Sequence, residues 1–70
     1  MTKRDPNVTR RLLRLKPAAE YLSVSTRAVR SLVQQGELPI VSLSENDHAP
    51  WLVDVRDLDS LVERKKKMVL

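Results

Sequence analysis

The sequence predicts a small domain of the mostly α class with one β-hairpin, in the order helix, turn, helix, two-stranded wing, helix. Two short apolar helical patterns flank a polar break at residues 23–25. An apolar, β-branched segment at residues 38–43 and a second apolar segment at residues 51–53 flank a polar turn, which is typical of a hairpin. A third helical pattern begins after Asp54. Together these observations predict a winged helix-turn-helix.

The first helix is expected at about residues 16–22, after an ordered segment that begins with Leu12 and Leu13. Pro17 suits the first helical turn, where its missing N–H leaves no hydrogen bond unmade. Glu20 faces outward in this helix. Four residues follow core-facing spacing, namely Ala18, Ala19, Tyr21 and Leu22.

The second helix is expected from about Thr26 to Gln35. Ser25 precedes it as an N-cap, because its hydroxyl can accept a hydrogen bond from a free backbone N–H of the first turn. Gly36 follows it as a left-handed C-cap. The apolar side of this helix consists of Val29, Leu32 and Val33, and the polar side consists of Arg27, Arg30, Ser31 and Gln34. Burial of the apolar stripe is expected to turn the polar side outward.

The wing is expected to consist of a strand at residues 38–43, with Pro39 near its start, and a return strand at residues 51–53. The polar turn between them spans residues 44–50. Trp51, at the start of the return strand, is expected to anchor a thin core rather than to stack on a base.

The last helix is expected to begin after Asp54, which can cap it. Its core face is expected to consist of Leu58, Leu61 and Val62. Asp54, Asp57 and Asp59 are not backed by a histidine or by a metal-ligand pattern, so a catalytic pair is not expected. We therefore predict that the protein is not an enzyme.

Length and composition exclude several classes of function. A chain of 70 residues forms one domain at most and has no room for a deep substrate cleft, so no small-molecule ligand is expected. With no cysteine and one histidine, it lacks the side chains for a disulfide or a cysteine- or histidine-rich metal site, and no cofactor is expected. No apolar run approaches the roughly 20 residues of a membrane span, and the N-terminal segment lacks the apolar stretch of a secretory signal. A cytoplasmic protein without membrane partners is expected.

The net charge of +4 is unevenly distributed along the chain. Residues 1–16 hold six basic residues and one acid, whereas residues 37–60 hold six acids and one basic residue. Four basic residues and one acid follow from residue 61 onward. Such asymmetry is typical of a protein that offers one face to a polyanion, although basic ends can also serve only solubility.

The same pattern predicts three segments. Residues 1–11 are expected to form a flexible basic arm, residues 12–64 a DNA-binding winged helix-turn-helix domain, and residues 65–70 a basic and apolar tail. Basic arms can follow the phosphate backbone of DNA and add salt-sensitive affinity that does not depend on sequence. Either end could equally bind a protein partner.

The second helix has the residue types that major-groove recognition requires. Short polar side chains at its N-terminus can meet phosphates, and longer donors one turn on can reach base edges. Ser25 and Thr26 suit the first role. Arg27 and Arg30 suit the second, and which of them reads a base is left open. The predicted DNA-binding residues are Ser25, Thr26, Arg27, Arg30, Ser31, Gln34, Arg10, Arg11, Arg14, Lys16, Lys65 and Lys66.

The chain resembles the small MerR-like winged-helix family, which includes phage and plasmid excisionases, also called recombination directionality factors, and short phage regulators. The resemblance covers about residues 13–63. It is carried by residues 18–22 (AAEYL), Val24-Ser25, residues 36–39 (GELP) and residues 51–58 (WLVDVRDL). In that family the wing usually carries arginines near the minor groove, whereas here the turn holds Glu45 and Asp47 and no arginine. The wing is therefore expected to skirt the DNA backbone or to face a neighbouring protein molecule.

The resemblance also implies a biological role. Effector-responsive members of the wider group continue into a dimerisation helix and a ligand-binding domain, for which 70 residues leave no room. We therefore expect a stand-alone module on double-stranded DNA, in a bacterial host at the nucleoid, which bends DNA, self-associates head to tail and assists a phage integrase in excision. A small transcriptional repressor is the close alternative. A protein-interaction adaptor that has lost DNA binding is the second alternative, favoured by the acidic wing.

Overall fold

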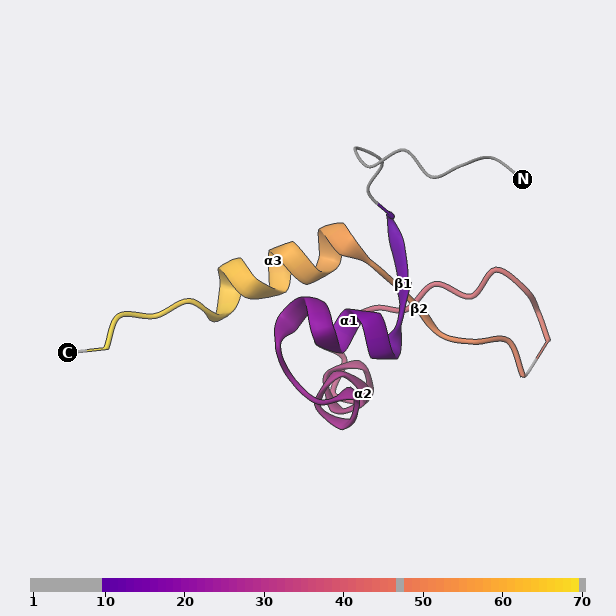
Figure 1. The fold of residues 1–70 in the computed structure, drawn as a ribbon, viewed down its shortest axis with the longest axis horizontal. Helices are drawn as coiled ribbons and strands as arrows, with labels where there is room; N and C mark the ends of the chain where they lie inside the picture. Colours follow the sequence, from indigo (N-terminus) through magenta and orange to yellow (C-terminus); the bar gives the residue numbers. More distant parts are fainter. Residues whose placement is uncertain (1–9, 47, 70) are drawn as a thin grey trace.

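The computed structural model describes residues 10–46 and 48–69 (Figure 1). Three helices and a two-stranded antiparallel sheet form a winged helix-turn-helix, which confirms the predicted fold class. The elements in chain order are β1 (Leu12–Arg14), α1 (Leu15–Leu22), α2 (Thr26–Gln34), β2 (Leu52–Asp54) and α3 (Val55–Lys65). Residues 1–9 of the predicted arm, Asp47 of the wing and Leu70 of the tail lie outside the described residues.

The turn between α1 and α2 is closed by backbone and side-chain caps. Ser23 adopts a left-handed conformation with φ of 60°, which lets the N–H of Val24 donate to the carbonyl of Ala19 at 2.9 Å. Ser25 then caps α2 as predicted, because its Oγ accepts from the backbone N–H of Ala28 at 3.1 Å. The two helices cross steeply, since Figure 1 looks along α2 while α1 lies across the view.

The end of α2 confirms the predicted glycine cap. Gly36 has φ of +79°, and its N–H donates to the carbonyl of Val33 at 3.1 Å. The N–H of Glu37 donates to the carbonyl of Leu32 at 3.0 Å. This pair of hydrogen bonds is the Schellman motif, which satisfies the last carbonyls of a helix and turns the chain away from its axis.

The sheet differs from the predicted hairpin in its pairing. β1 pairs with β2, with Leu13 opposite Val53, although residues 12–14 were not predicted as a strand. The strand predicted at residues 38–43 is reduced to one bridge, in which Val41 and Leu52 exchange hydrogen bonds of 2.7 and 3.1 Å. The prediction of a strand at residues 38–43 was wrong: Pro39 has no N–H for a ladder, and beyond the bridge at Val41 the segment has no strand partner.

The core lies where the three helices meet the sheet. It contains Ala18, Ala19, Val29, Leu38, Val53, Leu58 and Leu61, all buried. Leu13, Leu15, Leu22, Leu32 and Val33 pack around this cluster. The predicted stripe of α2 is thus confirmed as its inner side. Asp54 caps α3 as predicted, because its Oδ1 accepts from the backbone N–H of Arg56 at 2.9 Å.

Two predicted core residues lie at the surface instead, and a third is only half-buried. Tyr21 is 49% exposed, and its hydroxyl donates to Asp59 Oδ1 at 2.5 Å, a hydrogen bond that links α1 to α3. Trp51 is half-buried and stands outside the core cluster. Val62 is 40% exposed. Aliphatic side chains alone therefore form the buried core cluster.

Within the described ranges, none of the helices combines the length and the apolar character that crossing a bilayer requires. The longest of them, α3, has 11 residues.

Candidate nucleic-acid interface

The outer face of α2 presents exposed polar side chains. Arg27, Arg30 and Gln34 occupy the same side of the helix at spacings of three and four residues, and all three are exposed. Val29, on the opposite side, is completely buried and holds the helix against the core. No acidic residue lies within α2, so its outer face is positively charged. An exposed, rigidly mounted arginine pair is suited to phosphate oxygens and to base acceptors.

The N-terminus of α2 adds short polar groups to this face. Ser25 and Thr26 are both exposed. The Oγ of Ser25 accepts the Ala28 N–H, and its own hydroxyl hydrogen can still be donated to a phosphate. The free N–H groups of a helical first turn attract anions.

Arg30 is held by a residue from outside the helix. Its guanidinium carbon lies 5.6 Å from the centroid of the Trp51 ring, within the range of a cation–π interaction. Trp51 directly precedes β2, so this contact links α2 to the base of the wing. Arg27 has no comparable aromatic contact among the described residues.

Ser31 lies at the border of the polar face. It is half-buried and lines an apolar groove of about 480 Å³ between the turn and α3. The other residues that line this groove are Leu22, Val24, Ala28, Leu32, Gln35, Leu61, Val62 and Lys65. The structure thus places Ser31 beside Arg27 and Gln34 along the helix surface, but turned toward α3.

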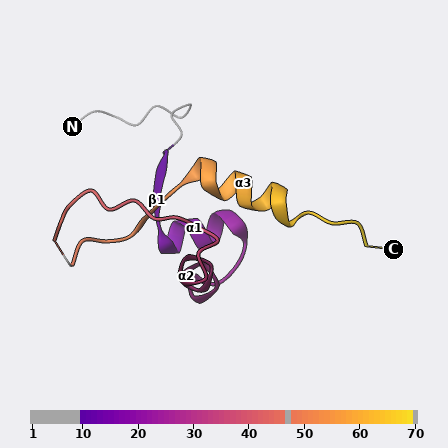
Figure 2. The ribbon, with the colours of Figure 1, turned by 180° about the vertical axis from the view of Figure 1, so that it is seen from behind.

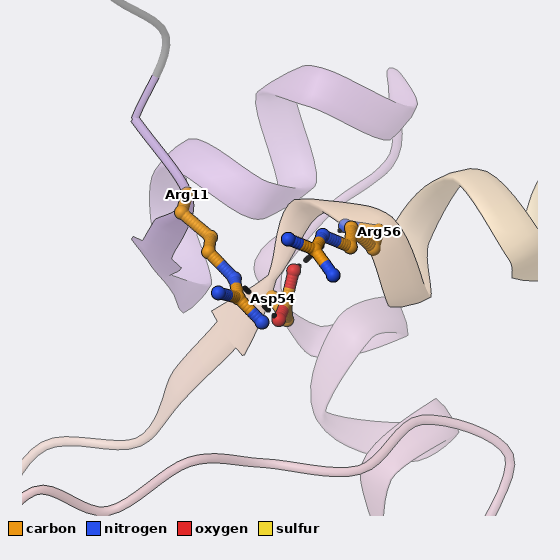
Figure 3. A network of polar contacts seen from close by, with 3 residues as sticks. All are labelled: Arg11, Asp54 and Arg56. Atoms are coloured by element: carbon orange, nitrogen blue, oxygen red, sulfur yellow. Dashed lines mark hydrogen bonds and ion pairs between the residues drawn. The ribbon is translucent and has the colours of Figure 1, made fainter.

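Arg11 is bound to the body of the domain by an ion pair. Its Nε donates to Asp54 Oδ2 at 3.0 Å, while Asp54 Oδ1 caps α3 through the Arg56 N–H (Figure 3). The backbone hydrogen bond from Arg56, followed by Arg11, holds the pKa of the Asp54 carboxyl below its ordinary value, against the opposing effect of partial burial. The Arg11 side chain remains 62% exposed, so it can reach a second anion on its other edge.

The basic end of α3 is also engaged within the protein. Lys65 Nζ lies 2.8 Å from Glu37 Oε1, and Arg64 Nη2 donates to the Glu37 carbonyl at 3.0 Å. The hydrogen bond from Lys65 lowers the pKa of Glu37 below its ordinary value. Lys66 pairs with Glu63 at 2.8 Å. These ion pairs lie at the surface and are therefore weak, so phosphate can replace them.

Arg10, Arg14 and Lys16 are exposed around β1 and the start of α1. Arg14 is two residues from Leu12 and alternates with Leu13, which packs against the core, so its side chain lies on the outer face of the sheet. The predicted basic residues outside α2 therefore form two groups, one at β1 and one at the end of α3. Figures 1 and 2 show α3 running away from β1, so the end of α3 lies apart from the start of β1.

The wing loop is stabilised by hydrogen bonds within itself. Ser42 Oγ donates to the Ser44 carbonyl at 2.8 Å, and Ser44 Oγ accepts from the Asn46 N–H at 3.1 Å. Asn46 Oδ1 accepts from the His48 N–H at 2.8 Å, and its carbonyl accepts from the Ala49 N–H at 3.0 Å. The side chains of Ser44 and Asn46 thus shape the loop, which extends from the body opposite the C-terminal tail (Figures 1 and 2).

Sequence reasoning did not identify the residues that hold the basic side chains. Asp54 and Glu37 bind Arg11 and Lys65, and Trp51 contacts Arg30. Each partner lies more than 20 residues away along the chain, so no local spacing could have revealed the pair. The only hint in the sequence is the net negative charge of residues 37–60. It indicates that acidic partners for the basic side chains lie there, but not which acid binds which base.

Residues 12–66 match the model of a helix-turn-helix domain family. No curated protein and no solved structure shows significant similarity to the chain.

Proposed function

The chain belongs to the helix-turn-helix domain family, and from this premise we propose that it binds double-stranded DNA in a sequence-specific manner through the outer face of α2. The observation that carries the proposal is the exposed set of Arg27, Arg30 and Gln34, mounted opposite the buried Val29. Arginine pairs with the two acceptors of guanine, and glutamine with adenine, so this face can discriminate bases. The protein acts by binding rather than by catalysis.

The basic residues outside α2 supply affinity that does not depend on sequence. Arg10, Arg14 and Lys16 are exposed at β1 and α1, and Arg11 retains free N–H donors beside Asp54. Lys65 and Lys66 can exchange their carboxylate partners for phosphate. Ser25 and Thr26, at the start of α2, contact the phosphate backbone of the DNA. Ser31 lies at the edge of this DNA-binding face. Each phosphate contact releases counterions, so binding weakens as salt rises.

Footprinting of the protein on its own genomic neighbourhood, followed by affinity measurements on the protected duplex, tests the proposal. Arg27→Ala and Arg30→Ala are each expected to weaken specific binding by about 1–3 kcal/mol. Arg56→Ala is the matched control, because it removes the same charge from an exposed position on α3. A footprint that survives in both α2 variants would overturn the proposed reading face. Absence of salt-dependent duplex binding by the wild type would favour the protein adaptor.

We further propose that DNA binding serves site-specific recombination. The resemblance of residues 13–63 to phage and plasmid excisionases supports this role, with head-to-tail copies of the protein bending repeated sites and a phage integrase as the partner. An excision assay with purified integrase and attachment-site DNA tests it. Stimulation of excision is the expected result. If recombination were unchanged and a nearby promoter were repressed, the protein would be a transcriptional regulator rather than an excisionase.

A further inference from the structure

We propose that Trp51 is a positioning residue for Arg30 and thereby contributes to the base specificity of the α2 face, an inference that rests on the proposed DNA binding. The ring centroid of Trp51 lies 5.6 Å from the guanidinium carbon of Arg30. Trp51 is half-buried, stands outside the core cluster and directly precedes β2. Its position therefore serves the surface of α2 more than the packing of the core.

The contact leaves Arg30 able to bind DNA. A cation–π interaction uses the face of the aromatic ring and the charge of the guanidinium, whereas the five N–H donors of arginine point outward in its plane. Arg30 is exposed, so donors on its outer edges remain accessible. An arginine already confined by an aromatic ring loses less conformational freedom when it meets a guanine, and this pre-organisation favours the correct base.

The same contact makes the reading position of Arg30 depend on the wing. Leu52, the neighbour of Trp51, pairs with both Arg14 of β1 and Val41 of the wing. The ring is therefore carried by the residue next to Leu52, which is hydrogen-bonded on both sides, and this is a more rigid support than a free loop. Arg27 has no such support among the described residues.

The geometry can be tested first without DNA, because Trp51 is the only tryptophan of the chain. Arg30→Ala removes the group that covers one side of the ring and is expected to shift the tryptophan emission to longer wavelength. Arg27→Ala is the matched control on the same helix and is expected to leave the emission unchanged. Equal emission spectra of the Arg30→Ala variant and the wild type would overturn the contact.

The functional test compares the affinity of each variant for the specific duplex and for an unrelated duplex. Trp51→Leu is expected to lower the ratio of the two affinities by about two- to tenfold while leaving binding to the unrelated duplex unchanged. Trp51→Phe keeps an aromatic ring and is expected to retain an intermediate ratio, which also covers the case in which the leucine variant folds poorly. In the Arg30→Ala background, Trp51→Leu is expected to have no further effect on the ratio.

Two other outcomes are distinguishable. If the wild type binds neither duplex, the proposed function fails. If the wild type discriminates between them, but the Trp51 variants keep the full ratio or lose affinity for both duplexes equally, DNA binding stands and the positioning role of Trp51 is overturned. A further loss on Trp51→Leu in the Arg30→Ala background would also overturn it.

Discussion

At the level of single residues, the turn between α1 and α2 contains a serine in the left-handed backbone conformation. Ser23 is the only non-glycine residue with positive φ among residues 10–46 and 48–69. A side chain costs roughly 1–2 kcal/mol in this conformation, which glycine adopts freely. The two hydrogen bonds from Ser23 and Val24 to the end of α1 offset this cost.

Ser23→Gly is therefore expected to raise the free energy of unfolding by about 0.5–1 kcal/mol, after the entropy that glycine adds to the unfolded chain is deducted. Urea unfolding followed by circular dichroism measures the change.

Gly36→Ala is the reverse substitution at the matching position, the left-handed residue that follows the C-terminus of α2. Gly36 has φ of +79°, and a Cβ at this position would meet no atom within 4 Å, so the only penalty is backbone strain. A loss of about 1 kcal/mol is expected. If both substitutions moved the unfolding midpoint in the same direction, the left-handed geometry would not determine their effect.

Asp54 makes stability depend on pH in the acid range. Its folded pKa lies below the ordinary value because the carboxylate accepts hydrogen bonds from the Arg56 N–H and from Arg11. The stabilisation is complete above the ordinary pKa of about 4 and is lost as the pH falls through the lower, folded value. Glu37, whose pKa is also lowered, acts in the same direction.

Asp54→Asn is expected to reduce the pH dependence of the unfolding midpoint between pH 5 and pH 2.5, because asparagine can accept the capping hydrogen bond but does not titrate. Urea unfolding at several pH values measures this slope. Glu45→Gln is the control, since Glu45 lies exposed in the wing. Equal slopes in the wild type and the Asp54→Asn variant would rule out this role of Asp54.

At the scale of elements, helices were predicted more closely than strands because their signals are local. Ser25, the stripe of α2 and Gly36 lie within one short segment, and each predicted feature is present. The sheet depends instead on β1 meeting β2, which is distant in sequence. Leu12-Leu13-Arg14 is too short to show an alternating pattern, so its role as a strand could not be recognised.

The site was predictable to a similar degree. The outward side of α2 followed from its apolar stripe, and the structure places Arg27, Arg30 and Gln34 on it. The surface positions of Tyr21 and Trp51 could not be foreseen, because both rings are amphipathic and their partners, Asp59 and Arg30, come from other elements. Hydrophobicity alone places such residues in the core, whereas tertiary packing decides between core and surface.

The segment after α2 begins with a buried core residue and continues into an exposed loop. Shortening a side chain is therefore expected to affect stability differently at its two ends. Leu38 is 1% exposed, whereas Leu43 is 74% exposed. Leu38→Ala is expected to lower the free energy of unfolding by about 2–5 kcal/mol, because it leaves a cavity in a small core. Leu43→Ala, the matched control, is expected to change it by less than about 0.5 kcal/mol. Thermal unfolding of both variants measures the contrast. Comparable losses in the two variants would contradict the assignment of Leu38 to the core.

At the scale of the whole molecule, the separation of base-reading and backbone-binding groups has a measurable signature. Arg14 belongs to β1 and is exposed on the outer face of the sheet, so it is not part of the base-reading face of α2. If it contacts one phosphate, Arg14→Ala is expected to weaken binding to specific and unrelated duplexes equally and to reduce the slope of log affinity against log salt by about 0.9. Titrations at four salt concentrations measure both quantities, with Arg56→Ala as the control. Loss of discrimination without a change of slope would move Arg14 to the base-reading group.

The pairing of β1 with β2 also determines the order in which a newly made chain can complete its fold. During synthesis α1, α2 and Leu38 emerge first and can pack, while β1 waits without a partner until Leu52–Asp54 has left the ribosome. The Arg11 carbonyl then accepts a hydrogen bond from the Val55 N–H, and Arg11 Nε donates to Asp54 Oδ2, which closes the domain. A product that stops before β2 has the complete α2 sequence but no closed core, so proteases are expected to remove it before it competes with the finished protein for DNA.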